Sequence, residues 1–420
     1  MTSKIKKYNN ILHLILNTWS NDSIGLYDYS SSSITKLTAF ISKSTYLVRK
    51  KGNIFQNIDQ HADIDTKKGD DLLFQVNGSN NGTFNLINPI PKNLKLTQVN
   101  FDYLNNKIWY VIKSESKDIP EKKDNNNEYN EEYYLNENDV IKLGGVKFAV
   151  QKIFIRPEVT NNLCDPPGPV IEAKYNISDL NKNTPPIFDY IYEANSDYAN
   201  INEEKEKIKC RYCENQPFNK ETDDEDNFLI SFCNCQELVH YKCLRNKMKL
   251  QMEIKNEAKK DQNIKTMTIK DFECPNCSNE YPVYFKLSNA DKIFNLVDIK
   301  EPKDCDYIIL ESIDYKQYKH FYKSIHIIKF KKETIRIGRE NNNEVISNDI
   351  SISPQHALLE LNNNKIYIRN LSQKFGTLVL IKNPLTILNK TIYLQVGRTY
   401  IKACLVSNEK NGKKETPQKK

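Results

Sequence analysis

Seven of the ten cysteines lie between Cys210 and Cys277, where they and one histidine form four close pairs. Two ligands separated by one or two residues can bind the same Zn2+, with thiolate sulfur atoms at ~2.3 Å from the metal. Eight ligands fill two tetrahedral sites and leave no open position for a substrate, so the pattern predicts two structural Zn2+ ions. In chain order, the ligand pairs are Cys210–Cys213, Cys233–Cys235, His240–Cys243 and Cys274–Cys277.

The order of four cysteines, one histidine and three cysteines resembles the RING-CH (RINGv) family. The resemblance implies interleaved sites, in which the first and third pairs hold one zinc and the second and fourth pairs hold the other. The single residue within the second pair and Leu244 after the third pair fit this family. The short spacing between Cys235 and His240, together with Phe272, is closer to the PHD finger, which stays open as an alternative.

A RING-type module implies binding of a ubiquitin-loaded E2 enzyme, with the module itself doing no chemistry. Tyr212 occupies the apolar E2-contact position between the first two ligands. Lys247 stands in the stretch where a tryptophan is expected, and Ser278 stands where a basic residue often follows the last ligand. An E3 ubiquitin ligase and a zinc module without ligase activity both stay open.

A second pattern lies near the C-terminus: Ile337-Gly338-Arg339, Ser353-x2-His356-Ala357, Asn370-Leu371-Ser372 before Gly376-Thr377, and Gly397-Arg398. Its order and spacing resemble a forkhead-associated (FHA) domain, which implies a β-sandwich that binds phosphothreonine. The resemblance assigns the phosphopeptide site to Gly338, Arg339, Ser353, His356, Gly376 and Thr377.

The chemistry of these residues suits a phosphate. Arg339 offers a rigid fork of donors for phosphate oxygens, and Ser353 adds a hydroxyl from a neighbouring loop. The resemblance implies that Gly338 permits a tight turn and that His356 braces the binding loop. Pro354 replaces an arginine of the family pattern, and Phe375 replaces an asparagine that contacts the peptide backbone. A purely structural sandwich is the alternative.

Fragments of the same pattern recur near the N-terminus, at Gln60-His61-Ala62, at Asn81-Gly82-Thr83 and at Val140–Gly144. They predict a degenerate FHA-like domain, with an unrelated β domain as the alternative. Asn53 and Ile58 would stand where the phosphate-binding arginine and serine belong. We therefore expect this copy not to bind phosphate.

Short β-rich runs bounded by turn residues predict a mostly β fold with one short helix, over 244–260. The expected organisation is a β-rich domain over 1–155, an extended proline-rich linker over 156–206, the zinc module over 207–287, the FHA domain over 306–407 and a disordered basic tail over 408–420. An acidic, asparagine-rich insertion over about 114–130 is expected to be a solvated loop.

No apolar run approaches the ~20 residues of a membrane span, and the apolar patch Ile11–Leu16 lacks the cleavage site of a signal peptide. A net charge of +7, spread over 420 residues, does not indicate nucleic acid as a partner. Clustered cysteines predict a reducing compartment, namely the cytoplasm, the nucleus or a cilium. These features predict a phosphothreonine-dependent adaptor that binds a threonine-phosphorylated protein and recruits an E2 enzyme. The alternative is a non-enzymatic scaffold.

Overall fold

The computed structural model describes residues 10–20, 25–50, 54–58, 71–79, 82–88, 102–112, 132–156, 192–194, 209–214, 228–232, 235, 238–257, 263–278, 280–287, 293–313, 323–388 and 390–407. Strands dominate these residues, which confirms the mostly β fold.

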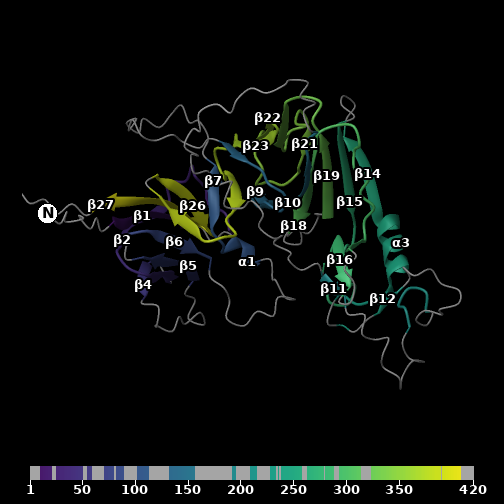
Figure 1. Ribbon diagram of the computed structural model, residues 1–420, viewed down its shortest axis with the longest axis horizontal. Helices are drawn as coiled ribbons and strands as arrows, with labels where there is room; N and C mark the ends of the chain where they lie inside the picture. Colours follow the sequence, from purple (N-terminus) through teal and green to yellow (C-terminus); the bar gives the residue numbers. More distant parts are fainter. Residues whose placement is uncertain are drawn as a thin grey trace, which may run out of the picture.

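One twelve-stranded sheet extends along the molecule, from β2 at one end to β14 at the other (Figure 1). Its strands, in spatial order, are β14 (Met252–Glu257), β15 (Ile264–Ile269), β19 (Lys323–Lys329), β18 (Tyr307–Ile313), β10 (Val146–Phe154), β9 (Val140–Leu143), β24 (Thr377–Leu380), β7 (Trp109–Ile112), β26 (Ile392–Val396), β27 (Thr399–Ser407), β1 (Asn10–Trp19) and β2 (Ile34–Ile41).

Two five-stranded sheets complete two sandwich lobes, and their buried side chains join those of the long sheet in a continuous core. We call the lobe around β1 the N lobe and the lobe around β20 the C lobe. The N-lobe sheet has the order β25 (Leu385–Ile387), β6 (Phe84–Ile87), β5 (Asp71–Gly78), β3 (Thr45–Lys50) and β4 (Ile54–Ile58). The C-lobe sheet has the order β8 (Glu132–Tyr134), β23 (Lys365–Asn370), β22 (Ala357–Asn362), β20 (Thr334–Gly338) and β21 (Val345–Ile346).

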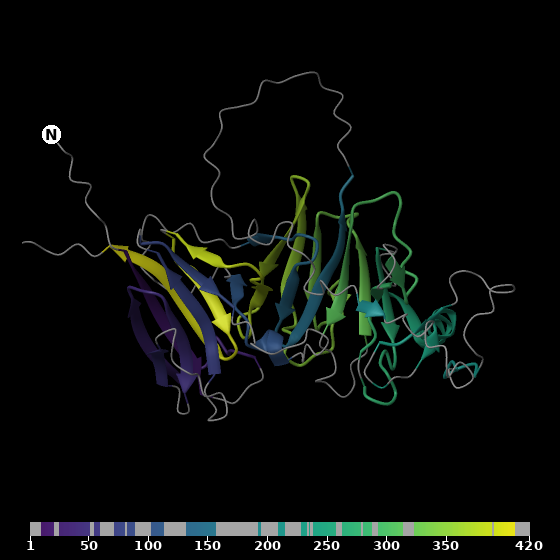
Figure 2. The same ribbon diagram turned by 60° about the horizontal axis from the view of Figure 1, so that its bottom comes forward.

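The two lobes exchange strands. The C-terminal strands β25 to β27 pair with β6 and β1 of the N lobe, while β8, β9 and β10 pair with β23, β24 and β18 of the C lobe. Figure 2 shows the yellow C-terminal strands among the purple N-terminal ones, and blue strands beside green ones. The structure thus differs from the separate β domains expected over 1–155 and 306–407. Closeness along the sequence does not decide which strands pair, because strands with the same alternation of apolar and polar side chains can pair with strands from either half of the chain.

The exchanged segments are equivalent hairpins. Val146 pairs with Leu143 across Gly144 and Gly145, as Thr399 pairs with Val396 across Gly397 and Arg398. Gly144 and Gly397 both have positive φ, +59° and +55°, which a tight hairpin turn requires and glycine adopts at no steric cost.

Strand β1 illustrates why these elements form. Its residues alternate between buried and partly exposed positions, with Leu12, Leu14 and Leu16 in the core. Such a period of two is typical of a strand that covers a core with one face. The apolar patch near the N-terminus is therefore part of the sandwich.

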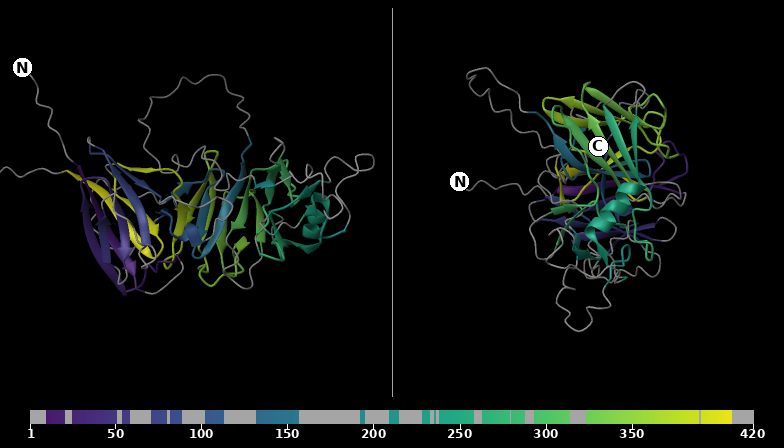
Figure 3. Two further views of the ribbon diagram at one scale, coloured as in Figure 1. Left: turned by 90° about the horizontal axis from the view of Figure 1, so that it is seen from below. Right: turned by 90° about the vertical axis from the view of Figure 1, so that its right-hand side faces the viewer.

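The zinc-ligand segment lies at the end of the molecule opposite to the N lobe (Figure 3). It contains α3 (Tyr241–Gln251), the pair β12 (Leu229–Ile230) and β13 (Val239–His240), and the sheet of β11 (Tyr192–Ala194), β16 (Tyr284–Leu287) and β17 (Ile293–Asn295). The helix expected over 244–260 is wrong in its second half. The backbone becomes extended at Met252, because β14 pairs with β15 and is thereby part of the long sheet.

Within the segment expected to be a linker, the structure describes β11, which pairs with β16 in parallel. The expectations for the acidic insertion and for the C-terminal tail lie outside the described residues. Among the helices that the structure describes, none has the length and apolar character needed to cross a membrane. The other described helix, α1 (Asp102–Asn105), precedes β7.

Candidate functional site

Four of the predicted zinc ligands come together in one cluster. The ligand atoms of Cys210, Cys213, His240 and Cys243 all lie within 4.8 Å of one another. His240 directs its Nδ1 at the thiols, 3.2 Å from the Cys213 sulfur and 3.9 Å from the Cys243 sulfur. One nitrogen and three sulfur donors at such distances fit a tetrahedral Zn2+ site.

Local structure positions these ligands. His240 ends β13, and Cys243 lies in the first turn of α3, so strand and helix direct both side chains towards the Cys210–Cys213 turn. Burial opposes ionisation of the Cys210 thiol, but the backbone N–H groups of His240, Cys213 and Tyr212 outweigh it and lower its pKa. A lowered thiol pKa favours the thiolate, which is the form that binds a metal.

A second cluster contains Cys235, Cys274 and Cys277, whose sulfur atoms also lie within 4.8 Å of one another. Cys233, the predicted fourth ligand, lies outside the described residues. The structure thus separates the described ligands into two interleaved sets, an arrangement that the RING-CH and the PHD resemblance both implied.

The two Cys-x2-Cys turns have the same backbone geometry. In each, the residue after the second cysteine donates its N–H to the carbonyl of the first, from Glu214 to Cys210 and from Ser278 to Cys274, both at 2.8 Å. Both donors have positive φ, +58° for Glu214 and +55° for Ser278. Arg211 joins the turns by donating from Nη1 to Oδ1 of Asn276 at 3.0 Å.

The predicted E2-contact residue is engaged within the chain. Lys247 on α3 donates from Nζ to the hydroxyl of Tyr212 at 3.1 Å, and the same ammonium lies 5.0 Å from the centre of the Tyr212 ring. Both the hydroxyl and the ring of Tyr212 are therefore in contact with Lys247.

The second candidate site is formed by the loops at one end of the C lobe. Arg339 follows β20 and is exposed, with its Nε 3.3 Å from the carbonyl oxygen of Ile352. Its backbone N–H donates to the carbonyl of Ser353 at 3.0 Å, which ties the two predicted phosphate-binding residues to each other. The hydroxyl of Ser353 lies 2.8 Å from that of Ser372.

Gly338 is required by close backbone packing. A Cβ at this position would lie 2.2 Å from the carbonyl oxygen of Pro354. That oxygen accepts a hydrogen bond from Nδ2 of Asn343 at 2.7 Å, so it cannot easily move away. Pro354, which replaces the arginine of the family pattern, thus contributes its carbonyl to the base of the loop.

His356 braces the loop from beneath and is fully buried. Its Nδ1 accepts the backbone N–H of Ser353 at 3.0 Å, so its Nε2 carries the proton and donates to the carbonyl of Gly376 at 2.8 Å. Burial lowers the pKa of His356 to about 4, although the Gly376 carbonyl opposes this shift, and the ring is neutral at pH 7.

Gly376 and Thr377 position the facing loop. Gly376 has a φ of +69°, and Thr377 donates from its hydroxyl to Oδ1 of Asn370 at 2.9 Å. Asn370 also binds both backbone groups of Ser372. Ser372 was part of the sequence motif but was not predicted as a site residue. Only the fold shows its hydroxyl next to that of Ser353.

The N lobe also contacts this loop. The backbone N–H of Tyr29 donates to the carbonyl of Lys374 at 2.8 Å, and the Lys374 ammonium lies 3.9 Å from the Asp28 carboxylate. The ring of Phe375 lies 6.5 Å from that of Trp19, centre to centre. Sequence spacing gives no signal for these contacts, because they join residues more than 300 positions apart.

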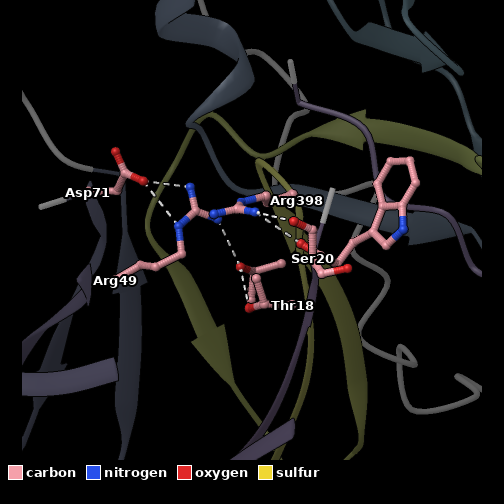
Figure 4. Close-up of polar contacts among 7 residues, drawn as sticks. Thr18, Ser20, Arg49, Asp71 and Arg398 are labelled. Carbon is pink, nitrogen blue, oxygen red and sulfur yellow. Dashed lines mark hydrogen bonds and ion pairs between the residues drawn. The ribbon is translucent and has the colours of Figure 1, made fainter. Parts of the chain in front are cut away.

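In the N lobe, arginines hold strands together (Figure 4). Arg49 is buried and binds the Asp71 carboxylate, at 2.6 Å from Nη2, and the Thr399 hydroxyl, at 3.2 Å from Nη1. Arg398 donates from Nη1 to the backbone carbonyls of Trp19 and Ser20. Of the positions expected to replace the phosphate-binding residues, Asn53 and the Ile58 side chain lie outside the described residues, as do Gln60-His61-Ala62.

Comparison with known proteins assigns one part of the chain. Curated proteins and solved structures give no match. Residues 335–399 match the FHA domain family, and no family match covers the cysteine-rich segment. The match begins in β20, includes every residue predicted for the phosphopeptide site, and continues through the exchanged strands β25 and β26. The chain therefore contains an FHA domain.

Proposed function

We propose that this protein binds threonine-phosphorylated proteins through the exposed loops of its C lobe. The observation that carries the proposal is the geometry around Arg339. Arg339 is exposed, its backbone N–H binds the carbonyl of Ser353, and the Ser353 hydroxyl lies 2.8 Å from that of Ser372, on loops fixed from below by the buried His356. Charge-assisted hydrogen bonds from an arginine fork and hydroxyl donors are the groups that recognise a phosphate ester.

The test is a titration of the full chain with a degenerate phosphothreonine peptide library and its unphosphorylated counterpart. A fragment of the C-terminal residues alone is unsuitable, since it would lack β7 to β10. Arg339→Ala should weaken binding at least about tenfold, because a hydrogen bond to a charged group contributes roughly 1.5–3 kcal/mol. Arg339→Lys should restore only part of this loss, because an ammonium lacks the planar fork.

Arg369→Ala is the matched control. Arg369 is an exposed arginine of β23 that pairs with Glu132 and Glu360, and its loss should leave peptide binding unchanged. Equal binding of both libraries, or indifference to Arg339→Ala, would leave a sandwich with a purely structural role.

A second activity, recruitment of an E2 enzyme by the zinc-ligand segment, is supported by the interleaved cysteine and histidine clusters. In such a ligase, the C lobe would select the phosphorylated protein and the zinc module would bring the E2. Ubiquitin discharge from a panel of E2 enzymes tests it, and Tyr212→Ala should slow discharge with both zinc ions retained. Absence of discharge with every E2 would favour the non-enzymatic scaffold.

A further inference from the structure

Strand β2 forms one end of the long sheet, at the outer side of the N lobe (Figure 1). It pairs with β1 along one edge, and of the strands that the structure describes none pairs with its other edge. A free edge presents a row of N–H and C=O groups that can pair with another strand. The outer edge of β2 is therefore a surface to which a further strand can add.

The C lobe shows what covers the equivalent edge. β1 lies between β27 and β2, as β18 lies between β10 and β19, so β2 and β19 have the same place in their lobes. The outer edge of β19 pairs with β15, an antiparallel strand, over residues 264–269. Among the described strands the N lobe has no counterpart of β15, and an antiparallel strand from a second chain would supply one.

The sequence of β2 does not protect its edge. Natural proteins prevent unwanted pairing of a free edge with proline, bulges and closely spaced charges. β2 has no proline, its register with β1 is regular throughout, and Lys36 is its only charged residue. β14, the strand at the other end of the sheet, carries three charged residues among its six. β2 is thus the end of the sheet that is open to a further strand.

Alternation along β2 determines which of its groups face outward. The N–H of Ser20 donates to the carbonyl of Ser33 at 3.1 Å, and such bonded pairs recur at every second residue of an antiparallel ladder. Lys36, Thr38 and Phe40 therefore direct their N–H and C=O groups away from β1. The Phe40 side chain is also 62% exposed, on the face of the sheet opposite to the core. A strand added here gains backbone hydrogen bonds and an aromatic contact.

The strand is complementary to its own copy. With a two-fold axis at Leu37, Phe40 lies opposite Ile34 of the second copy, an aromatic and β-branched pair that stabilises a sheet. Thr38 lies opposite Lys36 of the second copy, so like charges do not face each other. On the inner face, Leu37 lies beside its own copy and extends the apolar core. An axis at Thr38 would instead place Phe40 opposite Lys36.

We propose that β2 pairs with β2 of a second copy of this chain, antiparallel about a two-fold axis at Leu37. The pairing joins two twelve-stranded sheets into one continuous sheet. Such an interface is isologous, since each copy contributes the same strand, and it closes after two chains. The inference is independent of the proposed function of the C lobe.

Sedimentation equilibrium of the full, reduced chain over a range of concentrations tests the proposal. The mass should rise to twice that of the 49.1 kDa chain and no further. Thr38→Pro should raise the dissociation constant of the dimer at least about tenfold, because it removes an outward N–H that each copy donates to the other. The hydrogen bonds to β1 belong to the alternate residues of β2, so this variant keeps them.

Exposed charge variants test the register and keep the test valid if Thr38→Pro loosens β2. Thr38→Lys places a lysine opposite Lys36 of the second copy and should weaken the dimer roughly fivefold. Lys36→Glu combined with Thr38→Lys places opposite charges there and should restore the dimer.

Phe40→Ala should also weaken the dimer, because it removes the aromatic contact with Ile34 of the second copy. Ile254→Ala is the matched control, since Ile254 is an exposed apolar residue of β14 at the other end of the sheet, and it should leave the dimer unchanged.

Three results would overturn the proposal. The first is the mass of a single chain at every concentration. The second is a dimer that is indifferent to Thr38→Lys and to Phe40→Ala, since its interface would lie elsewhere. The third is a mass that keeps growing beyond two chains, which would indicate head-to-tail pairing of β2 with another edge such as β14.

Discussion

Replacement of Lys323 by methionine should destabilise this protein more than the loss of any exposed ion pair. Lys323 begins β19, and its side chain is 3% exposed. Its ammonium lies 2.8 Å from the Glu280 carboxylate, binds the Glu311 carboxylate as well, and lies over the ring of Phe272. Burial would lower the pKa of this lysine, but the two carboxylates outweigh it and raise the pKa to about 12.

The size of the stability loss follows from the charges that Lys323→Met would leave in place. Without the ammonium, two nearly buried carboxylates face each other, one three residues after Cys277 and one on β18. Removal of one partner of a buried ion pair costs about 3–5 kcal/mol, because the remaining charge loses both water and its partner. With a urea slope on the order of 2–3 kcal/mol/M, the unfolding midpoint should fall by about 1–2 M.

The matched control is Lys270→Met. Lys270 pairs with Glu253 at 2.5 Å, but both side chains are about half exposed, so the loss should be below about 1 kcal/mol. Combining Lys323→Met with Glu280→Gln and Glu311→Gln should recover much of the stability, because no charge is then left buried. Urea unfolding of all four proteins gives the comparison. Equal losses from Lys323→Met and Lys270→Met would refute the reasoning.

Three further outcomes are expected. Metal analysis of fresh, reduced protein should give two zinc ions per chain, and a result of one ion or none would contradict the two clusters. Chelation of the zinc should also lower the unfolding midpoint of the C lobe, because β15 pairs with β19. Gly338→Ala should weaken phosphopeptide binding at least about tenfold, because its Cβ would meet the Pro354 carbonyl, and a titration with the best peptide measures this loss. Because the pKa of His356 in the folded protein is about 4, below its unfolded value near 6.5, its stabilising effect is complete above pH 6.5 and falls by about 3 kcal/mol towards pH 4. The stability difference between the unmodified chain and His356→Gln, measured in urea, should therefore shrink as the pH falls from 7 to 5, and a constant difference would exclude this origin.

The cysteine and histidine spacings predicted four ligand pairs, which were accessible from the sequence because ligands one or two residues apart are close in any turn, whatever the rest of the fold does. The family resemblance implied how the pairs combine into two sets, and the described ligands lie in two clusters of those members. Strand positions were also accessible. The alternation of Leu12, Leu14 and Leu16 and the glycine turns at Gly144 and Gly397 are local patterns with local causes.

The strand partners were decided by the tertiary structure alone. The hairpins β9–β10 and β26–β27 both close on two-residue turns, so their local pattern does not tell them apart, and the exchanged pairing depends on competition among whole sheets. The same competition ends α3 at Gln251, since pairing of β14 with β15 overrides the helical pattern that follows. It also brings Trp19 to Phe375 and Glu280 to Lys323. Spacing along a chain determines which residues can share a turn, whereas contacts between distant residues depend on the free energy of the whole core.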